Sequence, residues 1–226
     1  MASPRTTPSL EKHLAIIRLI WSGKDPRSER VVFLERIILL LLCVAMLATP
    51  GFWVRHFGGK RGRTARKVWV EVYAISKLAL AAIVLYANVW TVPYSWIVIV
   101  GLLADVFINL AGYIFLRNFW QNPYSWNRSL MLLFVNFLEY TGWFACLYLS
   151  WGLLRNNGSV ITAASDALYF SIVTAATVGF GDITPSSGLG RFLVTVEILA
   201  SLFFIATVVS YFVSNMSGTE VDKPAE

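Results

Sequence analysis

Five long apolar runs constrain the fold of this chain more than any other feature of its sequence. They cover residues 31–54, 68–90, 96–116, 130–154 and 189–214. A bilayer core about 30 Å thick is crossed by a helix of roughly 20 apolar residues, so each run is long enough to span it. We therefore predict an all-α membrane protein with five hydrophobic spans, placed in the plasma or inner membrane as a multi-pass protein.

The charged residues support a bilayer partner rather than a nucleic acid. The chain is 57% hydrophobic and 14% charged, with a formal net charge of +6. Its basic residues gather at the ends of the apolar runs, as in "RHFGGKRGRTARK" (55–67), which holds six Lys or Arg and no acid. Such a segment is typical of a cytoplasmic loop. We expect no nucleic-acid partner.

Loop charges predict the direction of each span. Segments 55–67 and 117–128 are basic and are placed inside, whereas "TVPYS" (91–95) is uncharged and is placed outside. Run 130–154 then leads outward, and parity puts the N-terminus outside. An alternative stays open, in which 31–54 does not cross and turns back at "TPG" (49–51).

The N-terminal segment contains an amphipathic stretch, "LEKHLAIIRLIW" (10–21). Leu10, Leu14, Ile17 and Trp21 lie on one side at helical spacing, so we expect a helix on the membrane or on the protein body. His13 is expected at its surface. The first apolar run is expected to act as its own insertion signal, and the last residues are expected to be too short for a regulatory domain.

Residues 174–182, "TAATVGFGD", separate a short apolar run (163–176) from the last long one. The short run cannot cross the membrane and is expected to re-enter it. A dehydrated K⁺ needs about eight oxygens, which backbone carbonyls supply if successive carbonyls face one axis. Glycine reaches the backbone angles that this requires, so the sequence predicts converging carbonyls along this segment.

The segment "DALYFSIVTAATVGFGDITPSSGLGRF" (166–192) resembles the pore helix, selectivity filter and start of the inner helix of potassium channels. The resemblance is to the small bacterial type without a voltage-sensor arginine helix. It implies a re-entrant pore helix, a homotetramer, and K⁺ as the permeant ion with no other cofactor. The residues that it assigns to ion contact are Thr177, Val178, Gly179, Phe180 and Gly181.

The resemblance also assigns roles around the filter. Asp182 would lie at the outer mouth, and 130–154 and 189–214 would be the outer and inner helices. Leu202, Ile205 and Val209 would face an apolar cavity. The expected organisation is an N-terminal segment (1–30), an accessory domain (31–116), a linker (117–128), a pore domain (129–214) and a tail (215–226).

Five positions depart from the family pattern, of which Tyr169 and Phe170 stand where many members carry tryptophans. Phe180 replaces the commoner tyrosine, so bracing of the filter is expected to rest more on packing than on hydrogen bonds. Val173 stands where some bacterial members have a glutamate that partners the aspartate equivalent to Asp182. Ser201 stands where several relatives have a hinge glycine. These departures leave inactivation and gating open.

Four ionisable residues lie far from the ends of the spans: Lys77, Asp105, Glu139 and Glu197. A charge at such depth costs about 3 kcal/mol on insertion scales, so each needs a partner or a function. At 1.5 Å per residue, Lys77 and Asp105 are level on consecutive antiparallel helices, about 14 and 16 Å from the inner boundary. We predict an ion pair between them; the alternative is that each faces water or another polar group.

Glu139 and Glu197 are expected to support the pore scaffold, and Glu71 to contact Lys67 or lipid. No run carries the repeated arginines that voltage sensing needs. The sequence therefore predicts a potassium-selective channel without steep voltage gating. The alternatives are a weakly selective monovalent cation channel and a non-conducting regulatory subunit. An enzyme is not expected, and an unidentified gating ligand or protein stays open.

Overall fold

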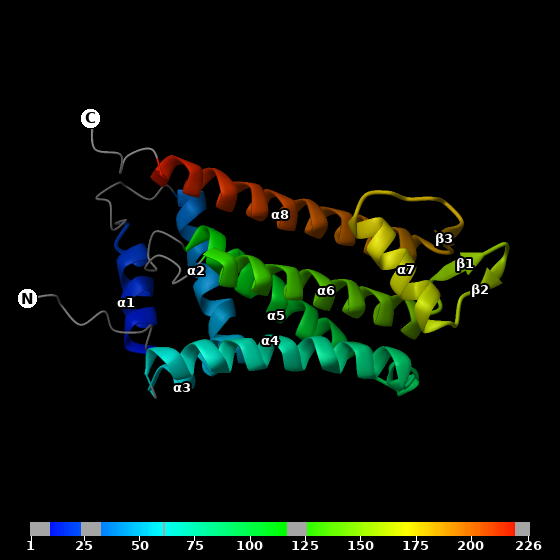
Figure 1. Cartoon of the computed structure of the whole chain (residues 1–226), viewed down its shortest axis with the longest axis horizontal. Coiled ribbons are helices and arrows are strands. Elements are labelled where there is room, and N and C mark those ends of the chain that lie inside the picture. The colour runs from blue at the N-terminus through cyan, green and yellow to red at the C-terminus, as the bar shows by residue number, and fades with distance from the viewer. Residues whose placement is uncertain (1–9, 24–32, 61, 117–125, 220–226) are drawn as a thin grey trace, which may run out of the picture. The chain divides into compact units, whose positions relative to one another are not determined.

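The computed structural model describes residues 10–23, 33–60, 62–116 and 126–219 (Figure 1). Parts of the expected N-terminal segment, linker and tail therefore lie outside the described residues. The helices are α1 (Leu10–Trp21), α2 (Phe33–Ala48), α3 (Pro50–Lys60), α4 (Arg63–Tyr86), α5 (Ser95–Phe115), α6 (Trp126–Ser150), α7 (Ala164–Ala175) and α8 (Gly188–Thr219), with a short 3₁₀ turn, η1 (Val89–Thr91). Three short strands are present: β1 (Leu154–Asn156), β2 (Ser159–Val160) and β3 (Ile183–Pro185).

The chain is a mostly helical membrane protein. Four segments of the described residues are long and apolar enough to cross a bilayer, and they lie in α4, α5, α6 and α8. Together α2 and α3 form a fifth candidate if their bent pair counts as one span. The predicted re-entrant run forms α7, which has 12 residues and is too short to cross.

The first apolar run is not one straight helix. It breaks at Thr49, where α2 and α3 meet at 73°. Pro50 opens α3 and has no N–H to continue a hydrogen-bond ladder from α2, so it suits the first position of a new helix. The Thr49 hydroxyl donates to the Met46 carbonyl at 2.8 Å. The break lies at the "TPG" sequence where the alternative interpretation places a turn.

The chain divides into two compact units, of which the first contains the described residues up to Leu80 and from Val100 to Asn136. Its core joins α1 to α2, with contributions from α5. The buried members of this core are Ile20, Leu39, Cys43, Met46 and Leu116, and Ile16 and Ile17 pack against them.

The packed face of α1 differs from the predicted one. Leu14 is 41% exposed and Trp21 71% exposed, whereas His13 is fully buried. The His13 Nε2 atom lies 2.9 Å from the Cys43 carbonyl oxygen, and its ring lies 4.8 Å from the Phe52 ring. The expectation of a surface histidine was therefore wrong, because a backbone partner on α2 makes burial of the ring favourable.

The second unit contains Ala81–Ile99 and the described residues from Phe137 onward. Buried aromatic residues of α6 fill its interior, and the Tyr140 ring stacks on Phe204 of α8 at 4.8 Å. In Figure 1, α7 and the three strands lie together at the end of this unit remote from the last turns of α8.

The small sheet was not predicted. Strand β1 lies between β2 and β3 and pairs antiparallel with both. Asn157 and Gly158, which join β1 to β2, have φ angles of 47° and 83°. A two-residue Asn-Gly turn with positive φ at both positions is a strong hairpin signal, so the sequence contained the information.

Acidification should weaken the packing of α1. Burial lowers the pKa of His13, the hydrogen bond to the Cys43 carbonyl opposes that shift, and the charge of Arg55 adds to it. Because the folded pKa lies below the unfolded value of about 6.5, stability present above pH 6.5 is lost as the pH falls toward the folded pKa. The loss is at most about 1.4 kcal/mol per pH unit in that window.

We expect the melting temperature of the wild-type protein in detergent to fall more between pH 7.5 and 5.5 than that of His13→Gln. Glutamine does not titrate and can still donate to the Cys43 carbonyl. Equal pH dependence of the two proteins would contradict the buried, neutral histidine.

Candidate functional site

The backbone of the TVGFG segment alternates in conformation. Positive φ angles occur at every second residue: Thr177 (58°), Gly179 (55°) and Gly181 (81°). Glycine reaches this region without strain, and a threonine there costs energy that neighbouring contacts must offset. In an ordinary strand successive carbonyls face opposite ways. Alternating handedness turns successive carbonyls toward the same side instead, which is the geometry that coordination of a dehydrated cation requires.

The C-terminal end of α7 holds the start of this segment. The backbone N–H of Thr177 donates to Thr174 O at 3.0 Å, and that of Val178 donates to Val173 O at 2.9 Å. The negative end of the α7 dipole therefore lies at the beginning of the segment. This polarity favours a cation near Thr177.

An aromatic stack braces the other side of the segment. The Tyr169 ring of α7 lies parallel to the Phe180 ring, with an interplanar angle of 1° and a centroid separation of 6.4 Å. The Tyr169 hydroxyl also lies close enough to the Asp182 carboxylate to interact with its charge. A tyrosine one turn before Val173 thus supplies the polar partner of Asp182.

One chain leaves much of the segment uncovered. Val178 is 53% exposed and Phe180 is 70% exposed. Packing of Phe180 against α7 agrees with the expected bracing of the filter, whereas Val178 stays half-exposed. These apolar side chains need a further surface to cover them.

The small sheet fixes the residues that directly follow the TVGFGD sequence. Strand β3 begins one residue after Asp182, and its Ile183 pairs with Asn156 of β1. The backbone N–H of Ser186 then donates to the Leu153 carbonyl at 2.8 Å. The end of the TVGFGD sequence is therefore tied to the residues that follow α6.

Glu197 of α8 connects three helices. Its Oε2 accepts a 2.6 Å hydrogen bond from the Tyr148 hydroxyl of α6, and its Oε1 contacts the Ser171 hydroxyl of α7. Ser171 Oγ lies 2.8 Å from the Thr141 carbonyl as well. A hydroxyl has one hydrogen, so both contacts of Ser171 are hydrogen bonds at once only if Glu197 carries a proton. The fully buried carboxyl thus acts as a neutral link.

Ser201, which replaces the hinge glycine of several relatives, is held by hydrogen bonds on the same side of α8. Ser201 Oγ lies 2.6 Å from the Tyr140 hydroxyl and donates to the Glu197 carbonyl at 2.8 Å. Helix α8 continues without interruption past this point. Leu202, Ile205 and Val209, the residues expected to face a cavity, are each about half-exposed in one chain.

Glu139 makes a contact within its own helix. Its Oε1 accepts a hydrogen bond from Trp143 Nε1 at 3.1 Å, one turn further along α6. Both side chains are fully buried.

The structure brings Lys77 and Asp105 together within the first unit. Lys77 Nζ lies 2.8 Å from Asp105 Oδ2, and both side chains are buried. Three more donors reach the same carboxylate: Tyr73 hydroxyl at 2.9 Å, Asn109 Nδ2 at 2.8 Å and the Gly51 N–H at 3.2 Å. Sequence reasoning missed these donors, although Tyr73 and Asn109 lie one helical turn from Lys77 and Asp105 and could have been found by that spacing.

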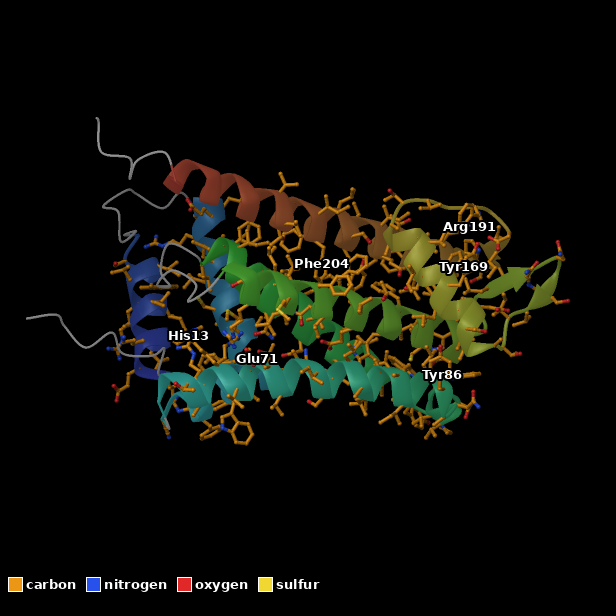
Figure 2. The ribbon with its side chains drawn as sticks, in the orientation of Figure 1. His13, Glu71, Tyr86, Tyr169, Arg191 and Phe204 are labelled. Carbon is orange, nitrogen blue, oxygen red and sulfur yellow. The ribbon has the colours of Figure 1, made fainter. Side chains whose placement is uncertain are left out.

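Glu71 has a different partner from the expected one. Its Oε1 lies 2.6 Å from Arg128 Nε, and Arg128 also donates to the Lys67 carbonyl (Figure 2 labels Glu71). Lys67, the expected partner, precedes Glu71 by four residues on the same helix, whereas Arg128 lies on α6. This contact joins residues that are distant in sequence, so the sequence alone could not predict it.

The buried Lys77–Asp105 pair should show strong energetic coupling. Removing one partner leaves a buried charge and costs about 3–5 kcal/mol, whereas removing both costs much less than the sum. We expect a coupling energy of at least about 2 kcal/mol from Lys77→Met, Asp105→Asn and the double variant in detergent unfolding. The more exposed Arg128–Glu71 pair is the control and should couple by less than about 1 kcal/mol. Additive effects at Lys77 and Asp105 would contradict the pair.

Glu197→Gln should preserve the link between the helices. A glutamine amide can donate toward Ser171 while its oxygen accepts from Tyr148, so the free energy of unfolding should change by less than about 1 kcal/mol. Glu197→Ala should cost about 2–4 kcal/mol, because it leaves a cavity and unpaired hydroxyls. Thr195→Ala, on the exposed side of the same helix, is the control. A Gln variant as unstable as the Ala variant would show that the carboxyl is ionised.

Comparison with known proteins places these features in a family. A family model described as "Ion channel" matches residues 96–217, which is more than half of the chain. The chain is 33% identical over 87 residues to "Two-pore potassium channel 4" of Arabidopsis thaliana, covering 38% of this chain and 30% of that protein. It is 34% identical over 77 residues to "Hyperpolarization-activated voltage-gated potassium channel" of Methanocaldococcus jannaschii, covering 34% of this chain and 35% of that protein.

A third relative is "Two pore potassium channel b" of Oryza sativa subsp. japonica, 39% identical over 54 residues, or 24% of this chain and 16% of that protein. The chain thus covers about a third or less of the length of these relatives. No solved structure matches it. The family match contains α6, α7, the TVGFGD segment and the greater part of α8, which are the elements that form the site, and the chain belongs to the ion channel family.

Proposed function

We propose that this protein conducts K⁺ selectively and passively across a cell membrane, with Thr177–Gly181 as the selectivity filter. The observation that carries the proposal is the positive φ at every second residue of this segment. It directs a row of carbonyl oxygens toward one side, where they can replace the hydration shell of the ion. The relatives named as potassium channels support the same ion.

Four copies complete the pore in this proposal. One chain supplies one filter strand, and a closed ring of carbonyls around an ion needs four. The exposed apolar side chains of Val178 and Phe180 fit a surface covered by neighbouring copies. Leu202, Ile205 and Val209 would then line an apolar cavity, which can gate by dewetting.

The remaining site residues support this pore. Asp182 concentrates cations at the outer mouth, where its carboxylate interacts with the Tyr169 hydroxyl of α7. Glu197 links the inner helix, the outer helix and α7, so it acts as a positioning residue for the filter. Glu139 has a scaffold role within α6.

Steep voltage gating is not part of the proposal. The relative from Methanocaldococcus jannaschii is named as voltage-gated, but that description applies to that protein. The apolar runs of this chain lack the repeated arginines through which a membrane field does work. Conductance should therefore change little between −100 and +100 mV.

Purified protein in liposomes tests the function directly. We expect K⁺ flux that Ba²⁺ blocks, and a reversal potential close to the K⁺ equilibrium potential in mixed K⁺ and Na⁺. A reversal potential near zero would instead show a weakly selective cation channel. Absence of any alkali-cation flux would indicate a non-conducting subunit and would overturn the proposal.

Two glycine variants test whether the filter backbone carries the conduction. Gly181 and Gly158 have φ angles of 81° and 83°, and nothing lies within 4 Å of a Cβ added at either. Alanine at each position therefore strains the backbone by a similar amount, about 1 kcal/mol per chain. We expect Gly181→Ala to lower K⁺ flux more than tenfold and Gly158→Ala, in the hairpin, to leave it within twofold. Equal flux from the two variants would contradict the assignment of the filter.

A further inference from the structure

A small polar pocket lies within the first unit, which does not contain the filter residues. Its volume is about 80 Å³, several times the roughly 10–15 Å³ that one water molecule needs. Helices α3, α4, α5 and α6 all contribute to its lining. The polar lining residues used below are Arg55, Tyr73, Lys77, Asp105, Asn109 and Asn136.

The charges around this pocket do not balance. Two cations, Arg55 and Lys77, face one anion, Asp105, and this carboxylate is already occupied by Lys77 and three further donors. Arg55 donates to the Asn109 side-chain oxygen, and no described carboxylate forms an ion pair with it. The charge of Asp105 stabilises the Arg55 cation without a direct ion pair, and the positive charge of Arg66 opposes this effect. The pocket therefore has an excess of positive charge.

Unused hydrogen-bond donors line the same pocket. The Arg55 guanidinium has five N–H donors, of which the Asn109 bond uses one. The Asn136 amide has no hydrogen-bond partner among the described residues. An arginine in an apolar segment needs an anion or water, because its desolvation is costly.

We propose that this pocket binds a phosphate oxyanion, carried by an anionic phospholipid or free in solution. Guanidinium groups bind phosphate through two parallel hydrogen bonds, and Asn136 would donate a third. Basic pockets between membrane helices are suited to such head groups. Asp105 stays bound to Lys77, so the arginine is the group that recognises the anion.

The bound phosphate would contact α6, which is the outer helix of the proposed pore. Leu132 and Asn136 belong to α6, which leads into the TVGFGD region of the family match. A bound phosphate would favour one position of α6 and so change the open probability. This last step rests on the proposed function, whereas the binding itself does not.

Native mass spectrometry of the purified protein tests the binding without any flux measurement. Protein is incubated with phosphatidylglycerol in detergent, and the bound lipid is counted for the wild type, Arg55→Gln, Asn136→Ala and Arg155→Gln. Arg155, exposed on β1, is the matched control for loss of one positive charge. We expect Arg55→Gln to lower retention at least fivefold, Asn136→Ala at least twofold, and Arg155→Gln to leave it unchanged. Asn136→Ala carries the test alone if Arg55→Gln fails to fold.

A second arm distinguishes the source of the phosphate. The melting temperature of delipidated protein is measured against inorganic phosphate, with sulfate-free chloride buffer of equal ionic strength as reference. A rise that Arg55→Gln abolishes assigns the site to a free anion, and retention of phosphatidylglycerol without such a rise assigns it to the lipid. The proposal is overturned if Arg55→Gln and Asn136→Ala behave like Arg155→Gln in both arms. If the protein binds phosphatidylglycerol but its K⁺ flux does not depend on that lipid, only the proposed effect on the pore is contradicted.

Discussion

Non-helical backbone between two apolar helices is the constraint on which the rest of this structure depends. Backbone polar groups at such depth are tolerated only where they line water or ions, or where protein groups satisfy them. Here the N–H groups at the start of the TVGFG segment turn back to α7 carbonyls. Its carbonyls are left facing one side, available to an ion. The alternating φ angles prevent this segment from pairing as an ordinary β-strand, and they also turn its carbonyls toward the position of the ion.

Several contacts keep that unusual backbone in place. Tyr169 stacks on Phe180, β3 ties the outgoing chain to β1, and Glu197 joins α6, α7 and α8. Each contact comes from an element different from the filter itself. A strained residue such as Thr177 persists only when its surroundings determine it in this way.

The two units handle buried polar groups by different means. In the first, Lys77 and Asp105 remain paired and draw in further donors, which compensates the desolvation of both charges. In the second, the hydroxyl groups of Tyr148 and Ser171 contact the two oxygens of the buried Glu197 carboxyl. In the first unit Arg55 therefore has no carboxylate of its own among the described residues. In the second unit both oxygens of Glu197 have a hydroxyl partner.

Properties of contiguous residues were determined by the sequence alone. Apolar length predicted the crossing helices, glycine spacing predicted the positive φ angles at Gly179 and Gly181, and helical rise placed Lys77 level with Asp105. Contacts between distant segments were decided only by the tertiary structure: the buried face of α1 with His13, the pairing of Arg128 with Glu71, the Gly51 donor at Asp105 and the donors around Glu197. The physical reason is that length, periodicity and backbone freedom are local, whereas burial and hydrogen bonding of a side chain depend on which distant groups the fold brings within 3 Å.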